Sequence, residues 1–319
     1  MTPFRPTPLR LLLLAVAIPL AVVAVLALRR PTLAPELRSS SPSQAGASES
    51  TAAATPTAGA SQVTATLLAV GDIAFCGSSA AEAVAKVASR LPGTIALLGD
   101  NAYPNGSATD YAHCFDPPWH GLRGRLRPVP GNHDYQTVHA EGYFSYFGAT
   151  AGTRGQGWYS YDLGGWHLVA LNSDCDAVGG CGPGSPQLAW LVADLAAHPV
   201  ACTLAYWHHP RFSSGLHGDE IQTDPLWRAL AAAGVDIVLT GHDHDYERFA
   251  PINGIRSFVV GTGGRSLYAW PGAPIANSEV RANDTYGLLE LQLGTGTYTW
   301  RFVRAAGGSL TDSGNGTCH

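Results

Sequence analysis

The sequence predicts an α/β sandwich in which two mixed β-sheets pack face to face, with helices outside and loops gathered along one edge. Two observations support this fold class. Short apolar runs that stop at a glycine alternate with segments of helical periodicity, and later segments alternate apolar with polar residues as antiparallel strands do. Polar residues follow several of the apolar runs, and loops beyond strand ends are where α/β folds usually place a site.

The chain begins with a segment that is typical of export. Within residues 1–30, an apolar run from Leu11 to Leu28 has arginines on both sides. Such a run fits either a signal peptide or an N-terminal membrane anchor. The arginine pair directly after the run makes cleavage at Ala27 unfavourable, so membrane anchoring through residues 11–28 is favoured over release. In both cases the rest of the chain is expected outside the cytoplasm, and the alanine-rich composition is typical of a bacterial protein.

Composition separates a linker from a folded domain. Residues 31–62 are rich in Ser, Thr, Ala and Pro, which cannot bury enough surface to offset ordering entropy, so a disordered linker is expected. Residues 63–319 are long enough for one well-packed domain that carries the chemistry. A net charge of −5 gives no electrostatic case for nucleic acid as the main partner. Nothing in the sequence indicates the oligomeric state.

The elements follow from periodicity and from where each apolar run stops. Buried strands are expected at Val63–Val70, Ile95–Leu98, a short run ending at Val129, Thr203–Trp207 and Val235–Leu239. Helices are expected at Ala80–Ser89, Pro186–Ala197 and Pro225–Ala233. Antiparallel strands are expected within Tyr143–Asn172 and at Arg256–Val260, Gly287–Leu293 and Tyr298–Val303.

Six cysteines in an exported protein favour disulfides. Cys175 and Cys181 flank a glycine-rich turn and would close a small loop. For the other four we expect Cys76 with Cys114, and Cys202 with Cys318, although six cysteines allow fifteen connectivities. A zinc–cysteine site is the alternative, and it is disfavoured because no pair has two-residue spacing.

Five polar clusters, most of them directly after an apolar run, carry the metal-binding residue types. They are Gly71-Asp72, Gly99-Asp100-Asn101-Ala102-Tyr103, Gly131-Asn132-His133-Asp134, His208-His209-Pro210 and Gly241-His242-Asp243-His244. Oxygen ligands mixed with imidazoles suit Zn, Fe or Mn. Glycine before a ligand permits a turn with positive φ and lets loops crowd the ions.

Two features of these clusters point to two ions rather than one. His242 and His244, two residues apart in an extended segment, would project to the same side and give one ligand to each ion. Asp100 lies midway among the clusters, as expected of a carboxylate that bridges both ions. Each cluster alone is also a common polar turn, so the ordered set is what predicts a dinuclear site.

The ordered motifs Gly-Asp, Gly-Asp-x-x-Tyr, Gly-Asn-His-Asp, His-x-Pro and Gly-His-x-His resemble those of the calcineurin-like metallophosphoesterases. Within that superfamily the chain looks most like the purple acid phosphatases and their bacterial relatives, over Thr64 to about Val303. Ala74 stands where many members carry a histidine ligand, whereas Tyr103 stands where the purple enzymes carry a tyrosine ligand. Tyr103 as an ordinary aromatic residue of the cleft is the alternative.

The resemblance implies a ligand set for each ion. The first ion would take Asp72, Asp100, Tyr103 and His244, and the second Asp100, Asn132, His208 and His242. A tyrosine ligand favours Fe(III) paired with a divalent Fe, Zn or Mn, and two Zn or two Mn ions are the alternative. His208 matches the family because it lies two residues before Pro210, so its neighbour His209 is expected to point away.

Three further residues are expected to act on the substrate. His133, with Asp134 beside it, would stabilise the phosphoryl oxygens and protonate the leaving group; the alternative is that His133 only orients Asn132. His217, nine residues after His208, matches a substrate-facing histidine of the plant enzymes, although Gly218 replaces the second histidine often found there. Asp243 is expected to hold the loop together, and Arg265 is a weaker candidate for a substrate contact.

The resemblance implies an exported phosphomonoesterase of the acid or alkaline phosphatase type that acts on a phosphorylated small molecule. Two ions about 3.5–4 Å apart would activate a hydroxide that attacks phosphorus without a covalent enzyme intermediate. One alternative is a phosphodiesterase that uses the same site on nucleotides or phospholipid headgroups. Another, from a different class, is a non-catalytic cell-surface binding protein with a vestigial site.

Overall fold

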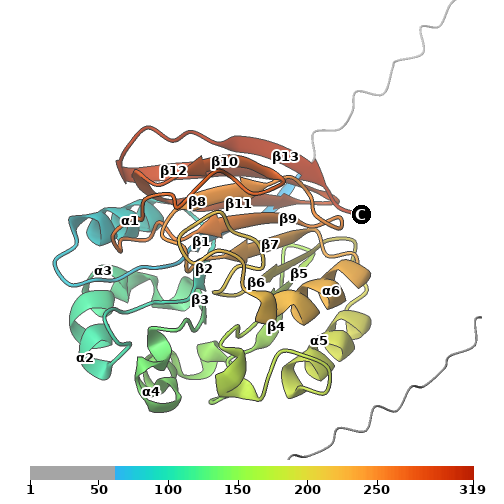
Figure 1. Ribbon diagram of the computed structural model, residues 1–319, viewed down its shortest axis with the longest axis horizontal. Coiled ribbons are helices and arrows are strands. Elements are labelled where there is room, and N and C mark those ends of the chain that lie inside the picture. The colour runs from blue at the N-terminus through green and yellow to red at the C-terminus, as the bar shows by residue number, and fades with distance from the viewer. Residues whose placement is uncertain (1–61) are drawn as a thin grey trace, which may run out of the picture. The chain divides into compact units, whose positions relative to one another are not determined.

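The computed structural model describes residues 62–319. A leader was expected in residues 1–30 and a disordered linker in residues 31–62. Apart from residue 62, both segments lie outside the described residues. None of the helices within the described range has both the length and the apolar character needed to cross a bilayer. The described chain forms two mixed sheets packed face to face with helices outside them, which confirms the predicted α/β sandwich (Figure 1).

The first sheet has six strands in the order β13-β12-β11-β1-β2-β3. They are β1 (Val63–Val70), β2 (Thr94–Leu98), β3 (Leu126–Val129), β11 (Thr285–Gly294), β12 (Thr297–Gly307) and β13 (Ser313–Thr317). Strands β1, β2 and β3 run parallel, so their carboxyl ends meet at one edge. Strand β11 pairs antiparallel with β1 on the side away from β2, and β12 pairs antiparallel with β11.

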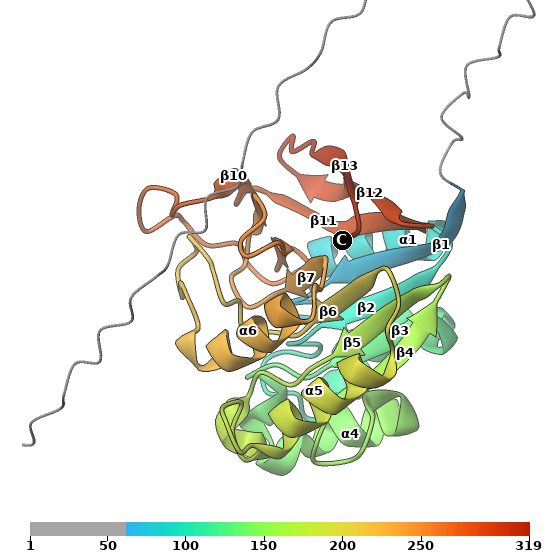
Figure 2. The same cartoon turned by 90° about the vertical axis from the view of Figure 1, so that its right-hand side faces the viewer.

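The second sheet has seven strands in the order β10-β8-β9-β7-β6-β5-β4. They are β4 (Tyr159–Leu163), β5 (Trp166–Ala170), β6 (Thr203–Tyr206), β7 (Ile237–Thr240), β8 (Tyr246–Phe249), β9 (Arg256–Val260) and β10 (Ser278–Ala282). Strands β5, β6, β7 and β9 are parallel, and the outer strands are antiparallel. Figure 2 shows both sheets with their strands side by side.

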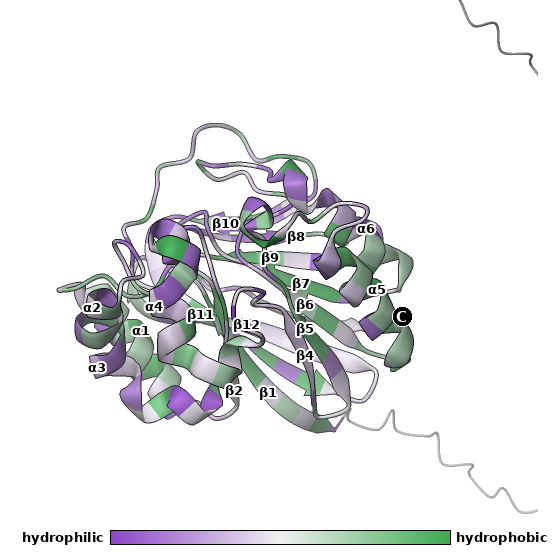
Figure 3. Cartoon of the chain, turned by 90° about the horizontal axis from the view of Figure 1, so that it is seen from below, coloured by the Kyte–Doolittle hydropathy of each residue, from purple (hydrophilic) through white to green (hydrophobic). Residues whose placement is uncertain are grey.

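Three apolar clusters hold the layers together. The cluster between the sheets includes Leu67, Trp166, Leu204 and Phe258, and Figure 3 shows green apolar bands on strands of both sheets. The helices lie on the outer faces: α1 (Ser79–Arg90), α2 (Ala108–Asp110), α3 (Asp116–Trp119), α4 (Glu141–Phe147), α5 (Pro186–Ala197) and α6 (Asp224–Ala232). Residues of α1, α3 and α4 share a cluster with the first sheet, and residues of α5 and α6 share one with the second.

Three expectations about elements need correction. The segment Tyr143–Asn172 is not all strand, because α4 occupies its start and only β4 and β5 form a hairpin. The aromatic side chains of α4 recur at helical spacing, and Tyr143, Phe144 and Phe147 pack into the outer cluster of the first sheet. Strand β9 is not purely antiparallel, since it pairs parallel with β7. Strands β8, β10 and β13 were not expected at all.

The structure confirms all three expected disulfides. Cys76 pairs with Cys114, Cys175 with Cys181, and Cys202 with Cys318. The last bond joins the residue before β6 to the residue after β13, so it links the two sheets. The zinc–cysteine alternative is therefore excluded for these residues.

Candidate metal centre

The polar clusters converge because they follow strands whose carboxyl ends lie at the same edge of the sandwich. Asp72, Asp100 and Asn132 follow β1, β2 and β3 of the first sheet. His208 and His242 follow β6 and β7 of the second sheet. The first sheet thus supplies the oxygen donors of its strand ends and the second sheet supplies imidazoles, so the site forms only when both sheets are packed together.

A first donor group surrounds the hydroxyl of Tyr103, which is almost completely buried. This oxygen lies 2.9 Å from Asp72 Oδ1, 2.9 Å from Asp100 Oδ2 and 3.1 Å from His244 Nε2. His244 Nε2 also lies 3.3 Å from Asp72 Oδ1. These are the four residues expected to hold the first ion.

A second donor group surrounds His208 Nε2. This nitrogen lies 3.2 Å from Asn132 Oδ1, 3.3 Å from His242 Nδ1 and 3.4 Å from Asp100 Oδ1. Donors about 2.1 Å from a shared ion lie roughly 3.0–3.4 Å from one another, so the spacing within both groups fits a metal. Asp100 turns one oxygen to each group, which is the arrangement of a bridging carboxylate.

Hydrogen bonds at the back of two imidazoles orient them toward these groups. His208 Nδ1 lies 2.8 Å from the carbonyl of Leu98, and His244 Nδ1 lies 2.7 Å from the carbonyl of Ser266. A carbonyl only accepts, so each Nδ1 carries a proton and each Nε2 faces the donor group, where a metal would take the place of any proton on it. Such outer contacts commonly fix the tautomer of metal-binding histidines.

The electrostatics of the site also fit cations. Burial opposes ionisation of Asp100, but the charge and hydrogen bond of His208 outweigh it and hold the pKa of that carboxyl well below its usual range. Burial lowers the pKa of His208, yet Asp100 raises it overall to about 10. Burial and the neighbouring carboxylates raise the pKa of Tyr103. In the metal-free chain His208 therefore carries the positive charge that a metal would supply, and Tyr103 keeps its proton.

The backbone at the strand ends confirms the expectation about glycines only in part, because Gly99 has a φ of 86° whereas Gly71, Gly131 and Gly241 are not left-handed. The left-handed residues are mainly the ligands themselves, with φ of 58° at Asp72, 50° at Asp100 and 72° at His242. His242 is therefore not in an extended segment, and it faces His208 whereas His244 faces Tyr103. Gly241 confirms the expected crowding of the loops, because a Cβ there would lie 2.7 Å from Asp72 Oδ2.

His133 and Asp134 take different positions relative to the donor groups. His133 Nδ1 lies 2.6 Å from the carbonyl of Pro104, so Nε2 is the free nitrogen, 3.9 Å from Asp100 Oδ2. Asp134 is fully buried and accepts hydrogen bonds from the backbone of Gly131 and from the Tyr111 hydroxyl. His133 Nε2 therefore faces Asp100, whereas the hydrogen bonds of Asp134 hold the loop that carries Asn132.

His217 lies at the second donor group, with its ring centroid 4.3 Å from that of His242. Its backbone N–H donates to Asp243, which also accepts from the hydroxyl of Ser213. His209 does not point away, because its ring lies 4.4 Å from that of His242. Burial lowers the pKa of His209 to about 3, so it stays neutral beside His208.

Two residues near the first donor group were missed or underrated from the sequence. Tyr268 stacks on His244 with ring centroids 4.1 Å apart, and no motif marks this position. The guanidinium of Arg265 lies over the ring of Tyr103 at 5.4 Å, which brings a fixed positive charge to the rim of the site.

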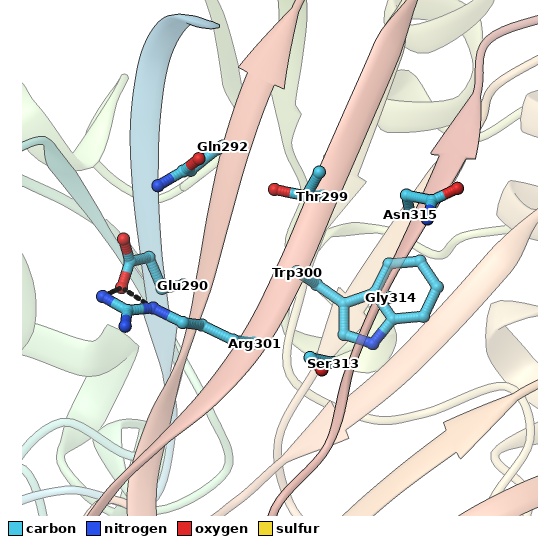
Figure 4. Close-up of a pocket in the computed structure, with 8 residues that line it drawn as sticks. All are labelled: Glu290, Gln292, Thr299, Trp300, Arg301, Ser313, Gly314 and Asn315. Atoms are coloured by element: carbon cyan, nitrogen blue, oxygen red, sulfur yellow. Dashed lines mark hydrogen bonds and ion pairs between the residues drawn. The ribbon is translucent and has the colours of Figure 1, made fainter.

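A separate hollow of about 460 Å³ lies across β11, β12 and β13 and contains none of the donor residues. Figure 4 shows its polar side chains, with the ion pair of Arg301 and Glu290 at one side.

Comparison with known proteins agrees with the site. Purple acid phosphatase 15 of Arabidopsis thaliana is 27% identical over 216 residues, covering 56% of this chain and 40% of that protein. Purple acid phosphatase 18 of the same plant is 35% identical over 118 residues, covering 34% and 25%. The chain thus spans less than half the length of these curated relatives.

A solved purple acid phosphatase from yellow lupin (Lupinus luteus) seeds shares the fold, with a TM-score of 0.70 and 19% identity over 79% of this chain and 53% of that one. The model of the family described as calcineurin-like phosphoesterase matches residues 65–246, which include every expected ligand. With more than half of its length matched, the chain belongs to the calcineurin-like phosphoesterase family and is similar to the purple acid phosphatases within it.

Proposed function

We propose that this protein is an exported phosphomonoesterase that hydrolyses phosphate esters of small molecules at a site for two metal ions. The observation that carries the proposal is the position of Asp100, whose two carboxylate oxygens face two separate groups of donor atoms. Family membership supports phosphoester chemistry, and the preference for monoesters and the location outside the cytoplasm are part of the proposal.

The bound ions would supply an activated water and neutralise charge on the phosphoryl oxygens. The residues of the chain would do the rest. His133 presents Nε2 beside Asp100 and can stabilise a phosphoryl oxygen or donate a proton to the leaving alcohol. His217 lies beside His242 and can contact the ester group. Asp134 would position the loop of Asn132 rather than touch the substrate.

The test compares an aryl phosphate with a bis-aryl phosphate. A phosphomonoesterase turns over the first with a much higher kcat/KM than the second. Efficient hydrolysis of only the diester would replace the proposal by a phosphodiesterase. Absence of hydrolysis together with absence of bound metal would instead point to a binding protein with a vestigial site.

The metals are proposed to be Fe(III) with a divalent Fe, Zn or Mn. The support is the Tyr103 hydroxyl, which lies among three donors of the first group. Elemental analysis together with a visible spectrum tests this, because a phenolate bound to Fe(III) absorbs in the visible. A colourless protein with two zinc ions would contradict the iron assignment and leave the hydrolase proposal standing.

Export is tested separately by cell fractionation. The full chain expressed in a bacterium should place the folded domain outside the cytoplasm, where an added protease reaches it in intact cells. A domain protected by the cytoplasmic membrane would contradict this part of the proposal.

A further inference from the structure

A small hollow lies beside the second donor group and is lined mainly by acidic and polar side chains. Its volume is about 220 Å³, and its lining includes Asp174, Asp176 and Glu220. Ser173 and His209 also line it. None of the described residues that line this hollow is Lys or Arg, so its carboxylates have no cationic side chain within the wall.

His209 lines the hollow on one side and lies against the metal centre on the other. Its ring centroid lies 4.4 Å from that of His242 and 4.8 Å from that of His208. Ser173 holds this ring in place, since its hydroxyl lies 2.8 Å from His209 Nδ1 and accepts from the His209 backbone N–H at 2.9 Å. The hollow therefore begins about one imidazole ring away from the second donor group.

Asp174 contributes an oxygen that has no partner. Its Oδ2 is buried and makes no hydrogen bond within the described structure. Buried polar atoms almost always have a partner, so this carboxylate oxygen is free to pair with a group from outside the chain. Burial raises the pKa of Asp174 to about 7, against the opposing charge of His208, and a bound cation would favour its ionised form.

The loop that carries Asp174 and Asp176 is held in shape. The disulfide between Cys175 and Cys181 closes it, and the side chain of Gln187 bonds both the N–H and the carbonyl of Asn172 just before it. A hollow built on a braced loop can select a ligand without first paying ordering entropy.

We propose that this hollow binds the positively charged end of the leaving group, so that the preferred substrates are phosphate monoesters of amino alcohols such as choline or ethanolamine. The inference rests on the proposed function, because it places the phosphoryl group at the metal centre and the ammonium group past His209. In the reaction, water adds to phosphorus, the ester P–O bond breaks, and the departing amino alcohol takes up a proton. Leaving groups that carry a carboxylate or a second phosphate would be repelled.

The test uses two esters of nearly the same shape. Phosphocholine and 3,3-dimethylbutyl phosphate differ only in a quaternary nitrogen in place of a carbon. With the metal-loaded full chain, kcat/KM should be at least about tenfold higher for phosphocholine, since a contact with a charged group commonly has that effect. Asp174→Asn and, independently, the exposed Asp176→Asn should each lower this ratio toward one. Glu82→Gln, which removes the charge of an exposed residue on α1, should leave the ratio unchanged.

Calorimetry gives a readout without turnover. Choline should bind the wild-type protein and compete with phosphocholine, whereas 3,3-dimethylbutanol should bind more weakly, and Asp174→Asn should remove the difference. Equal kcat/KM for the two esters with no choline binding would overturn the inference while leaving the phosphatase proposal intact. If no monoester is hydrolysed, the proposed function fails. Choline binding then tests by itself whether the hollow binds a cation, and absence of binding would overturn the inference as well.

Glycerophosphocholine separates a free amino-alcohol phosphate from a lipid headgroup. This diester carries the same cation, and the inference expects it to be hydrolysed far more slowly than phosphocholine. Faster hydrolysis of the diester would overturn the assignment to monoesters.

Discussion

Tyr103 is the residue that separates an iron-binding site from a general two-metal site. Burial and the carboxylates of Asp100 and Asp72 raise the pKa of its phenol, so only a strongly charged ion would displace the proton. The Tyr103→Phe variant should therefore lack any visible absorption band when loaded with metal. It should also release one proton fewer than the wild type when Fe(III) binds. Absorption spectroscopy and proton release during titration measure the two effects. A band that survives the substitution would show that Tyr103 is not a ligand.

Asp100 holds both donor groups together through its two oxygens. Asp100→Asn keeps the shape but removes the charge that faces both positions, so both ions should bind more weakly. Even outer partners of metal ligands commonly change affinity by about 10- to 100-fold, so activity should fall by more than about a hundredfold. Elemental analysis after dialysis measures the metal content. Loss of only one ion would contradict a bridging role.

Asp134 gives a pH dependence that can be checked on the metal-free protein. Burial, together with the charge of Asp100, raises the pKa of Asp134 to about 6 despite the hydrogen bond from Tyr111. The unfolded value is about 3.9, so the folded state holds the proton more tightly. Protonated Asp134 therefore stabilises the folded state fully below about pH 4. This stabilisation, roughly 3 kcal/mol of unfolding free energy, is lost as pH rises through about 6.

Asp134→Asn removes this titration while keeping an acceptor for the backbone of Gly131. The difference in unfolding free energy between wild type and variant should therefore change between pH 4 and 6 and stay flat above pH 7. Denaturant unfolding at several pH values measures it. A difference that is constant across this range would contradict a raised pKa.

At the scale of elements, the strands that end in ligands were predictable because each is an apolar run that stops at a polar cluster. Strand β13 (Ser313–Thr317) was not, because it has no apolar residue. Its glycines are required by packing: a Cβ at Gly314 or Gly316 would overlap the rings of Trp300 and Tyr298 on β12. The pattern of the strand thus depends on its neighbour, which local periodicity does not show.

The disulfides give a prediction at the same scale. Cys202 and Cys318 are 116 residues apart, whereas Cys175 and Cys181 are only 6 apart. In the chain-entropy model the long loop stabilises by about 5 kcal/mol and the short one by about 2 kcal/mol. Replacing the first pair by serine should therefore lower the free energy of unfolding more than replacing the second. Equal losses in denaturant unfolding would show that native-state contacts, not loop length, set the effect.

At the scale of the whole molecule, the ligand positions were predictable because parallel strands carry their carboxyl ends to one edge. The environment of the site was not, because it depends on which loops cross that edge. His209, Tyr268 and Asp174 come from three different loops, and no spacing in the sequence relates them. The acidic hollow therefore depends on how these loops pack together, which the sequence does not show.

Both sheets and all the donor residues lie within residues 62–319, so this part should fold and bind metal alone. Shortened to begin at Gln62, the protein should keep its metal content, and its melting temperature should stay within about 2 °C of that of the full chain, because the strands that pair with β1, namely β2 and β11, lie within the described residues. Calorimetry and elemental analysis measure these quantities. Loss of either ion on shortening would mean that residues before Gln62 contribute to the site.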